Sequence, residues 1–236
     1  MGEEWFSIAT LDHFWISRRY DVLRRLTASL SGQGRRYVDV GCGYGLLQGA
    51  LVRDYGCQVD GCDLNMDALL KNQSNQQCYH YDILEGRPGF LEKYDGVFAL
   101  DVLEHIADET AFMESLFAMA KPGGFVCLNV PALMFLYSDY DRRVGHHRRY
   151  SIADIRRLAQ KLGASIQAWS YWGLPLIPLA VVRKQVLKFV ADENKIKAGF
   201  KPPGRLGNSL LRAACALEKI PNHTVGASLL VVLKRS

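Results

Sequence analysis

Hydrophobic and polar positions along the chain follow two periods. Short apolar runs typical of buried strands end at polar residues or glycine turns, and helix-period segments separate most of them. The predicted strands are RRYVDVGCG, CQVDGCD, QCYHYD, YDGVFALD, FVCLNVP, SIQAWSYW and ASLLVVLKR. This succession predicts an α/β, Rossmann-like fold in which a seven-stranded, mostly parallel sheet carries helices on both faces.

Helix-period segments fill the intervals between these strands. Apolar residues from Leu11 to Leu30 fall on one broad face, which predicts an N-terminal helix. Further helices are expected from Leu46, over MDALLKNQ, from Glu109 to Ala120 and after Ser151, where Asp154 completes a capping-box pattern. In parallel sheets of this kind, ligands bind beyond the carboxyl ends of the strands.

A chain of 236 residues with 49% hydrophobic content can bury one substantial core, so a single domain over residues 1–236 is expected. Its predicted parts are an N-terminal helical segment (1–34), a ligand-binding core (35–131), a basic loop (132–150) and a hydrophobic and helical cap insertion (174–224). The insertion holds the apolar run YWGLPLIPLAVV, the polar loop ADENKIKAGFKPPGRLGN and a helix through Leu210, Leu211, Ala214, Leu217 and Ile220. The apolar run is shorter than the roughly 20 residues that span a bilayer. A buried wall, a peripheral membrane contact and a dimer interface all remain open for it, as do monomer and homodimer.

Charge and cysteine content exclude few functions. Lys and Arg number 29 against 24 Asp and Glu, and this mild excess allows an anionic partner without requiring one. The six cysteines form no CxxC pair, which favours buried thiols in a reducing compartment over disulfides or a metal site. The segment MGEEWFSIATLDHF lacks the basic and apolar regions of a secretory signal. We therefore expect a cytoplasmic protein, with membrane association as an alternative, and no metal.

The stretch VDVGCGYG places Gly41, Gly43 and Gly45 at alternate positions between the first strand and its helix. Such a turn lets a ligand approach the backbone and exposes the helix N-terminus. Leu46 replaces the third glycine of the dinucleotide-binding GxGxxG pattern. Asp39, just before the turn, would repel a pyrophosphate and suits a cationic group. The turn therefore predicts a ligand with an amino group in place of phosphates.

Two further carboxylates end predicted strands. Asp63 follows the turn at the spacing expected of an acidic residue that binds ribose hydroxyls. Asp82 could accept a hydrogen bond from the exocyclic amine of adenine. Adenosine with a cationic tail describes S-adenosylmethionine (SAM). An NAD-dependent oxidoreductase and a non-catalytic SAM-binding protein are the alternatives from other classes.

The motifs VDVGCGYG, GCDLN, YDILEG, YDGVFALDVLEHI and MAKPGGFVCLNVP, in this order, resemble those of class I SAM-dependent methyltransferases of the small bacterial type. The flanking HFWISRR and VPALMFLYSDYDRRVGHHRRY resemble the HWWF and VPA…GHxRRY elements of one subgroup, although Phe14 and Ile16 depart from the first element. The resemblance implies SAM as the cofactor. It also implies a set of SAM-binding residues: Asp39, Gly41, Cys42, Gly43, Gly45, Asp63, Leu64, Asp82, Ile83 and Leu100.

The resemblance also gives these residues roles. The glycine turn would pass under the methionine part, and Asp39 would approach its amino group. Asp63 would hold the ribose, and Leu64 would pack on the adenine. Asp82 and Ile83 would reach the adenine edge. Leu100 would line the sulfonium pocket, with His105 supporting its wall.

The basic loop after the fifth strand is the predicted acceptor site. Guanidinium groups match phosphate and carboxylate in a two-pronged geometry. The candidate acceptor-binding residues are Tyr137, Arg142, Arg143, His147, Arg148 and Arg149. His146, in the GH position of the subgroup, is the candidate general base, since imidazole titrates near neutral pH. Asp141 would orient His146 or act as the base itself, and some of the arginines could instead pair with scaffold carboxylates.

The predicted function is methyl transfer from SAM to a hydroxyl of a small, glycosylated or lipid-linked metabolite or natural product. Methylation of nitrogen or carbon is the alternative within the same class. A nucleic-acid acceptor is disfavoured because the fourth strand ends in ALDVLEH, without the Asn-Pro-Pro-Tyr type of motif that grips a nucleobase amine, and because no aromatic stacking platform is evident.

Overall fold

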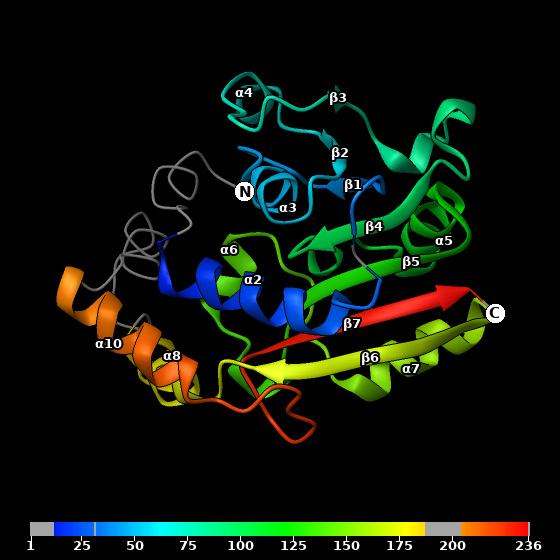
Figure 1. The fold of residues 1–236 in the computed structure, drawn as a ribbon. Helices are drawn as coiled ribbons and strands as arrows, with labels where there is room; N and C mark the ends of the chain where they lie inside the picture. Colours follow the sequence, from blue (N-terminus) through cyan, green and yellow to red (C-terminus); the bar gives the residue numbers. More distant parts are fainter. Residues whose placement is uncertain (1–11, 31, 187–203, 236) are drawn as a thin grey trace.

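The sheet has seven strands in the order β3-β2-β1-β4-β5-β7-β6 (Figure 1). The computed structural model describes residues 12–30, 32–186 and 204–235. The strands are β1 (Arg36–Val40), β2 (Gln58–Asp63), β3 (Cys78–His80), β4 (Tyr94–Leu100), β5 (Ala120–Pro131), β6 (Ala164–Trp172) and β7 (Ser228–Arg235). β7 alone runs antiparallel, between β5 and β6. The predicted seven-stranded, mostly parallel sheet is confirmed.

Helices cover both faces of this sheet, as predicted. They are α2 (Phe14–Thr27), α3 (Leu46–Tyr55), α4 (Met66–Leu70), α5 (Glu109–Met119), α6 (Asp139–Arg143), α7 (Ile152–Lys161), α8 (Ile177–Val186) and α10 (Arg205–Ala216). Short 3₁₀ turns are η1 (Ile83–Glu85), η2 (Pro88–Phe90), η3 (Leu103–His105), η4 (Met134–Leu136) and η5 (Leu174–Leu176). One apolar core joins α5 and α7 to the sheet, and a second core joins α2 and α3 to it.

Local signals set several element boundaries. α3 begins at Leu46 as expected, because Gly45 adopts the left-handed conformation at its N-cap. The Ser151 and Asp154 side chains form the predicted capping box of α7. The start expected for the N-terminal helix at Leu11 lies outside the described residues. His13 caps the observed helix, and its Nδ1 atom accepts from the Trp15 amide.

Some predicted elements have different bounds in the structure, because tertiary contacts determine where they begin and end. β3, at the sheet edge, pairs with β2 over only three residues, so the strand predicted to reach Asp82 ends at His80. β5 extends back to Ala120, through the KPGG segment expected to be a turn, with a register shift opposite Tyr94 and Gly96. The helix α10 ends before Leu217 and Ile220, which the sequence pattern had included.

The cap insertion packs against the N-terminal helix. The described parts are η5, α8 and α10; most of the predicted polar loop, residues 191–203, lies outside the described chain. α10 lies along α2 (Figure 1), and the Phe14 amide donates to Asn208 Oδ1 at 2.9 Å. No helix in the described part of the chain is long and apolar enough to cross a membrane.

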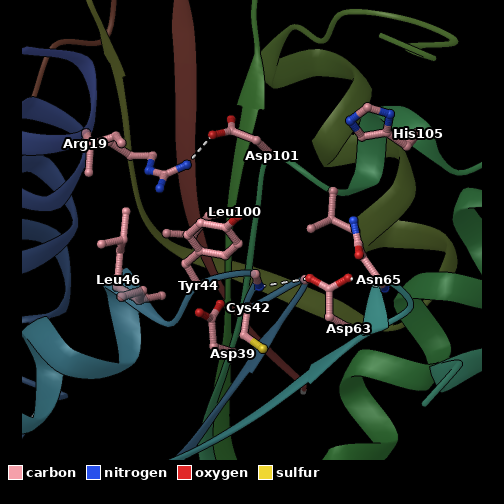
Figure 2. A pocket seen from close by; sticks show the side chains of 15 residues that line it. Arg19, Asp39, Cys42, Tyr44, Leu46, Asp63, Asn65, Leu100, Asp101 and His105 are labelled. Atoms are coloured by element: carbon pink, nitrogen blue, oxygen red, sulfur yellow. Dashed lines mark hydrogen bonds and ion pairs between the residues drawn. The ribbon is translucent and has the colours of Figure 1, made fainter. Parts of the chain in front are cut away.

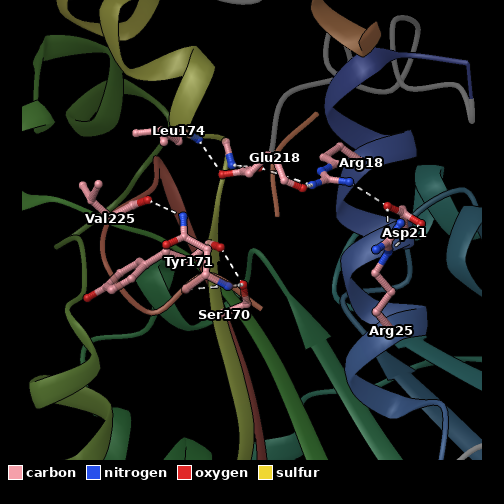
Figure 3. A network of polar contacts seen from close by, with 10 residues as sticks. Arg18, Asp21, Arg25, Ser170, Tyr171, Leu174, Glu218 and Val225 are labelled. Atoms are coloured by element: carbon pink, nitrogen blue, oxygen red, sulfur yellow. Dashed lines mark hydrogen bonds and ion pairs between the residues drawn. The ribbon is translucent and has the colours of Figure 1, made fainter. Parts of the chain in front are cut away.

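A buried ion-pair network fastens α2 to the segment after α10 (Figure 3). One Arg18 guanidinium nitrogen donates to Asp21 at 2.7 Å, and the other donates to the Glu218 carbonyl at 2.8 Å and lies 3.5 Å from its carboxylate. The Glu218 carboxylate also accepts from the Gly173 and Leu174 amides at 2.9 Å each. Arg18 and Glu218 are almost completely buried, so this network joins α2, the end of β6 and the insertion in a water-poor environment.

Arg18→Ala is expected to lower the free energy of unfolding by about 3 kcal/mol, because it leaves the Glu218 carboxylate buried without its cation. Urea unfolding at pH 7 measures this change. Arg25→Ala is the matched control, since Arg25 on the same helix is 55% exposed and forms its ion pair with Asp21, which is itself 40% exposed. Its effect should stay below about 0.5 kcal/mol. Equal losses in the two variants would contradict the proposed importance of the network.

Candidate functional site

A cavity opens at the carboxyl ends of β1, β2 and β4, with α2 and η3 forming its sides (Figure 2). Of the ten residues predicted to bind SAM, six line this cavity: Asp39, Gly41, Cys42, Gly43, Asp63 and Leu100. The sequence-predicted ligand site and the cavity are therefore largely the same place. Residues that the sequence analysis did not assign also line it, among them Arg19, Tyr44, Asn65 and Asp101.

The glycine turn has no room for side chains at two positions. Gly41 has φ +77°, and a Cβ there would lie 2.6 Å from Val102 Cγ2. Gly45, also at φ +77°, would place a Cβ 2.4 Å from Asn72 Oδ1. The Gly43 amide donates to Asp63 Oδ2 at 2.8 Å, so the carboxylate at the end of β2 holds the turn in shape. Gly45 itself starts α3 and does not line the cavity.

Asp39 is buried at the end of β1, and its environment disfavours the charged form. Burial raises the pKa of this carboxyl to about 8; Asp63 and Cys78 add to the rise, and Arg19 opposes it. Asp39 is therefore mostly protonated near neutral pH in the free protein. A cationic group placed against it would restore its charge.

Asp101 and Arg19 form an ion pair across the mouth of the cavity (Figure 2). Asp101 follows β4 in a left-handed conformation with φ +60°, which is unusual for a residue other than glycine. Asn129 fixes it from β5, donating from its side chain to Asp101 Oδ1 at 2.6 Å and accepting the Asp101 amide at 2.8 Å. The motif HFWISRR contains Arg19, but only the packing of α2 brings this residue to the end of β4.

Besides Gly45, three predicted SAM-binding residues lie outside the cavity lining. The Leu64 side chain is 63% exposed. Asp82 caps η1 by accepting the Leu84 amide at 2.9 Å, and Ile83 is buried in the core. Their assignment to the adenine remains a prediction.

Asp141, on α6, is the anchor of the predicted acceptor loop. Its buried carboxylate accepts from Arg149 Nε at 2.9 Å and from the Ser138 amide and hydroxyl at 2.9 and 3.0 Å. His146 Nδ1 lies 3.1 Å from the same carboxylate. Burial alone would raise the pKa of Asp141. The hydrogen bond from His146 and the charge of Arg149 outweigh the effect of burial and hold this pKa at about 2. A fully engaged, ionised carboxylate suits the orienting role better than that of a base.

His146 contacts Asp141 through its Nδ1 atom and packs against His105, a residue that lines the cavity. Its Nε2 atom faces Glu104 Oε1 at 3.9 Å, and its ring makes an edge contact with the His105 ring, with centroids 4.7 Å apart. His105 lines the cavity, as the sequence analysis expected of a supporting residue. Burial, followed by the neighbouring His146, lowers the pKa of His105 to about 4. Burial raises the pKa of Glu104 well above its usual value, and Asp101 adds to this rise.

The arginines of the loop do not converge on one anion site. Arg148 pairs with Glu109 at 2.5 Å, and Arg149 pairs with Asp141 at 2.7 Å. Arg142 pairs with Asp139 and is 62% exposed. Arg143 and His147 are also exposed, while the Tyr137 hydroxyl donates to the His146 carbonyl at 2.8 Å. Arg142, Arg148 and Arg149 thus each pair with a carboxylate of the protein itself, and acceptor binding by any of these residues remains a prediction.

The strand order 3-2-1-4-5-7-6, the glycine turn after β1 and the carboxylates ending the next strands define the class I SAM-dependent methyltransferase fold. Residues 14–168, well over half of the chain, match the family model described as a methyltransferase domain, and the chain belongs to this family. The predicted enzyme class, a SAM-dependent methyltransferase, and the predicted donor are confirmed at this level.

Two curated relatives are similar to part of the chain. It is 33% identical over 109 residues to the ubiquinone biosynthesis O-methyltransferase of Cereibacter sphaeroides, a match that covers 44% of each chain. With the Coxiella burnetii protein of the same name it shares 29% identity over 128 residues, covering 49% of this chain and 53% of that one. The matches thus span about half the length of these curated relatives or less.

Among solved structures, the phosphoethanolamine N-methyltransferase 2 of Haemonchus contortus in complex with SAM aligns with a TM-score of 0.59 and 19% identity, over 93% of this chain and 52% of that chain. This likeness shows the shared fold.

Binding of S-adenosylhomocysteine at pH 7 should release close to one proton, because the ligand's ammonium group lowers the raised pKa of Asp39. Calorimetry in buffers of different ionisation enthalpy measures the release, which should fall away above about pH 8, where free Asp39 is already ionised.

Asp39→Asn should abolish the proton release and weaken binding by about 2 kcal/mol, or about 30-fold, as expected for the loss of a charge-assisted hydrogen bond. Binding at pH 7 without proton release by the wild type would contradict contact between Asp39 and the amino group.

Proposed function

We propose that the protein transfers the methyl group of SAM to a hydroxyl oxygen of a small, amphipathic acceptor. In this in-line displacement the acceptor oxygen bonds to the methyl carbon as the carbon–sulfur bond breaks, S-adenosylhomocysteine leaves and the hydroxyl loses its proton. One observation carries the proposal: the His146–Asp141 pair contacts His105, which lines the side of the donor cavity.

The donor would lie in the cavity with its polar groups on the strand ends. Asp39 suits the ammonium group of the methionine part, because a cation there offsets the cost of its buried charge. Asp63 holds the glycine turn and ends β2, the strand position associated with ribose. Leu100 and His105 would then border the sulfonium and its methyl group.

The relatives named above favour oxygen as the methylated atom, since both carry the name O-methyltransferase. A hydroxyl must lose its proton during transfer, and an imidazole oriented by a buried carboxylate is a common arrangement for accepting one. The Asp141–His146 pair fits this requirement, whereas the arginines of the loop do not. Transfer to nitrogen or carbon has no comparable observation in its favour.

The surface beside this pair favours an acceptor with an apolar part. α8 reaches the acceptor side through Lys184, whose Nζ donates to the Phe135 carbonyl at 2.6 Å, and through Arg183, which lies 4.7 Å from the Tyr140 ring. Exposed apolar side chains gather on η4, η5 and α8: Met134, Phe135, Leu174, Leu179, Val182 and Val186. This proposal includes a glycosylated or lipid-linked acceptor with an acidic group that meets Arg142 and Arg143. It also includes peripheral contact with a membrane.

His146→Gln should lower kcat by about 100-fold or more, the usual contribution of a positioned base, and leave SAM binding unchanged. Release of S-adenosylhomocysteine with a panel of phenols and lipid-linked alcohols measures turnover, and mass spectrometry identifies the methylated atom. His223→Gln is the matched control, because His223 is exposed and stacks on Trp169 far from the cavity. Unchanged turnover in His146→Gln, or methylation of nitrogen or carbon alone, would refute the proposal.

A further inference from the structure

Glu104, His105 and His146 bring three potential ligand atoms together beside the donor cavity. One carboxylate oxygen and one nitrogen from each ring lie within 4.8 Å of one another. Among the described residues, this is the one group of three or more such side chains with this geometry. η3 supplies Glu104 and His105, and the loop after α6 supplies His146.

Two of these side chains have a buried polar atom without a hydrogen-bond partner. Glu104 is 1% exposed, and its Oε2 makes no hydrogen bond. The ring of His105 makes a backbone hydrogen bond with Gly145, but its Nε2 also lacks a partner. Burying a polar atom unsatisfied costs about 1–3 kcal/mol, so such atoms in native proteins call for an explanation. Two of them in one cluster indicate that something else binds there.

The third side chain, His146, is oriented by a carboxylate, as metal-binding histidines commonly are. Asp141 fixes the hydrogen of His146 on Nδ1, so the lone pair of Nε2 is directed to the Glu104 side. A carboxylate behind a ligating imidazole sets its tautomer and raises its basicity as a ligand. Arg149 and Ser138 in turn hold Asp141, so the orientation of His146 is set by several contacts.

We propose that Glu104, His105 and His146 bind a divalent transition-metal cation, with zinc as the best match. Two imidazoles and one carboxylate form a ligand set that favours zinc and its neighbours over magnesium, and three protein ligands leave a position for a further oxygen. Ligand atoms bonded to a tetrahedral zinc ion at about 2.1 Å lie about 3.4 Å apart, so the widest pair, now within 4.8 Å, must close by up to about 1.4 Å through side-chain rotation.

The charges around the cluster are compatible with a cation. Arg19 and Arg149 lie nearby, but Arg19 pairs with Asp101 and Arg149 pairs with Asp141. Among the described residues, His146 is the one potentially cationic side chain within salt-bridge distance of Glu104. Adding a divalent cation therefore supplies charge where the carboxylate is buried. The sequence analysis expected no metal because the cysteines form no CxxC pair, whereas these ligands come from two segments about 40 residues apart.

The cation would act in the reaction proposed above, on which this part of the inference rests. The acceptor hydroxyl would take the open position, and the cation would favour loss of its proton to solvent. The oxygen then bonds to the methyl carbon as the carbon–sulfur bond breaks. In this state His146 is a ligand and not the direct proton acceptor, and its replacement lowers kcat in either case.

Titration of the chelator-treated full-length protein with ZnCl₂, followed by calorimetry and elemental analysis, tests the site. The wild type should bind one zinc ion per chain. Glu104→Gln, His105→Asn and His146→Ala should each weaken binding by about 100-fold or more, and Asp141→Asn by about 10-fold, the range found for residues behind a ligand. His223→Gln should bind as the wild type does. Circular dichroism shows whether each variant is folded.

Cobalt(II) provides a readout that a merely structural role would not change. The visible absorption of the bound ion should report nitrogen ligation in the wild type, and the spectrum should change in His105→Asn even at saturating cobalt. Absence of stoichiometric binding, or binding by Glu104→Gln at wild-type strength, would overturn the inference and leave water as the occupant of the cluster.

The metal site and the methyl transfer can fail separately. Full methyl transfer after chelation would overturn the cation's role and leave the proposed function standing. Stoichiometric zinc binding, with no methylation of any hydroxyl compound in the panel, would refute the proposed function and support the metal site.

Discussion

Acidic side chains crowd the carboxyl edge of the parallel sheet, and the structure around them resolves their mutual repulsion in different ways. Asp63 accepts backbone hydrogen bonds from Gly43 and Asn65. Asp101 pairs with Arg19. Asp39 has neither arrangement, and burial raises its pKa to about 8. Carboxylates this close cannot all stay ionised without partners. The cavity is thus prepared for a ligand that carries a positive charge.

This arrangement depends on the N-terminal helix α2. Arg18 and Arg19 are neighbours in sequence but face different partners: Arg18 joins Glu218, which follows α10 within the insertion, and Arg19 joins Asp101 at the end of β4. The Arg18 network holds the helix where Arg19 can reach the cavity. The described part of the predicted insertion therefore contributes to the donor site through α2, the helix on which it packs.

The acceptor side follows a similar principle. The basic loop is rich in arginine, and Arg148 and Arg149 form ion pairs with the scaffold carboxylates Glu109 and Asp141. Arg149 helps to keep Asp141 fixed and ionised, and Asp141 in turn orients His146. The orientation of His146 beside Glu104 and His105 thus depends on the ion pair between Arg149 and Asp141.

The sequence by itself determined the alternation of strands and helices, the start of α3 at Leu46, the capping box at Ser151 and the cavity position of Asp39 and Gly43. These features depend on short-range signals: hydrophobic period, backbone freedom at glycine and side-chain caps. Tertiary structure alone decided that Arg19 meets Asp101 and that Glu104 and His105 face His146. Such contacts join segments some 40 to 80 residues apart, and their geometry depends on how the helices pack on the sheet, which no local pattern encodes.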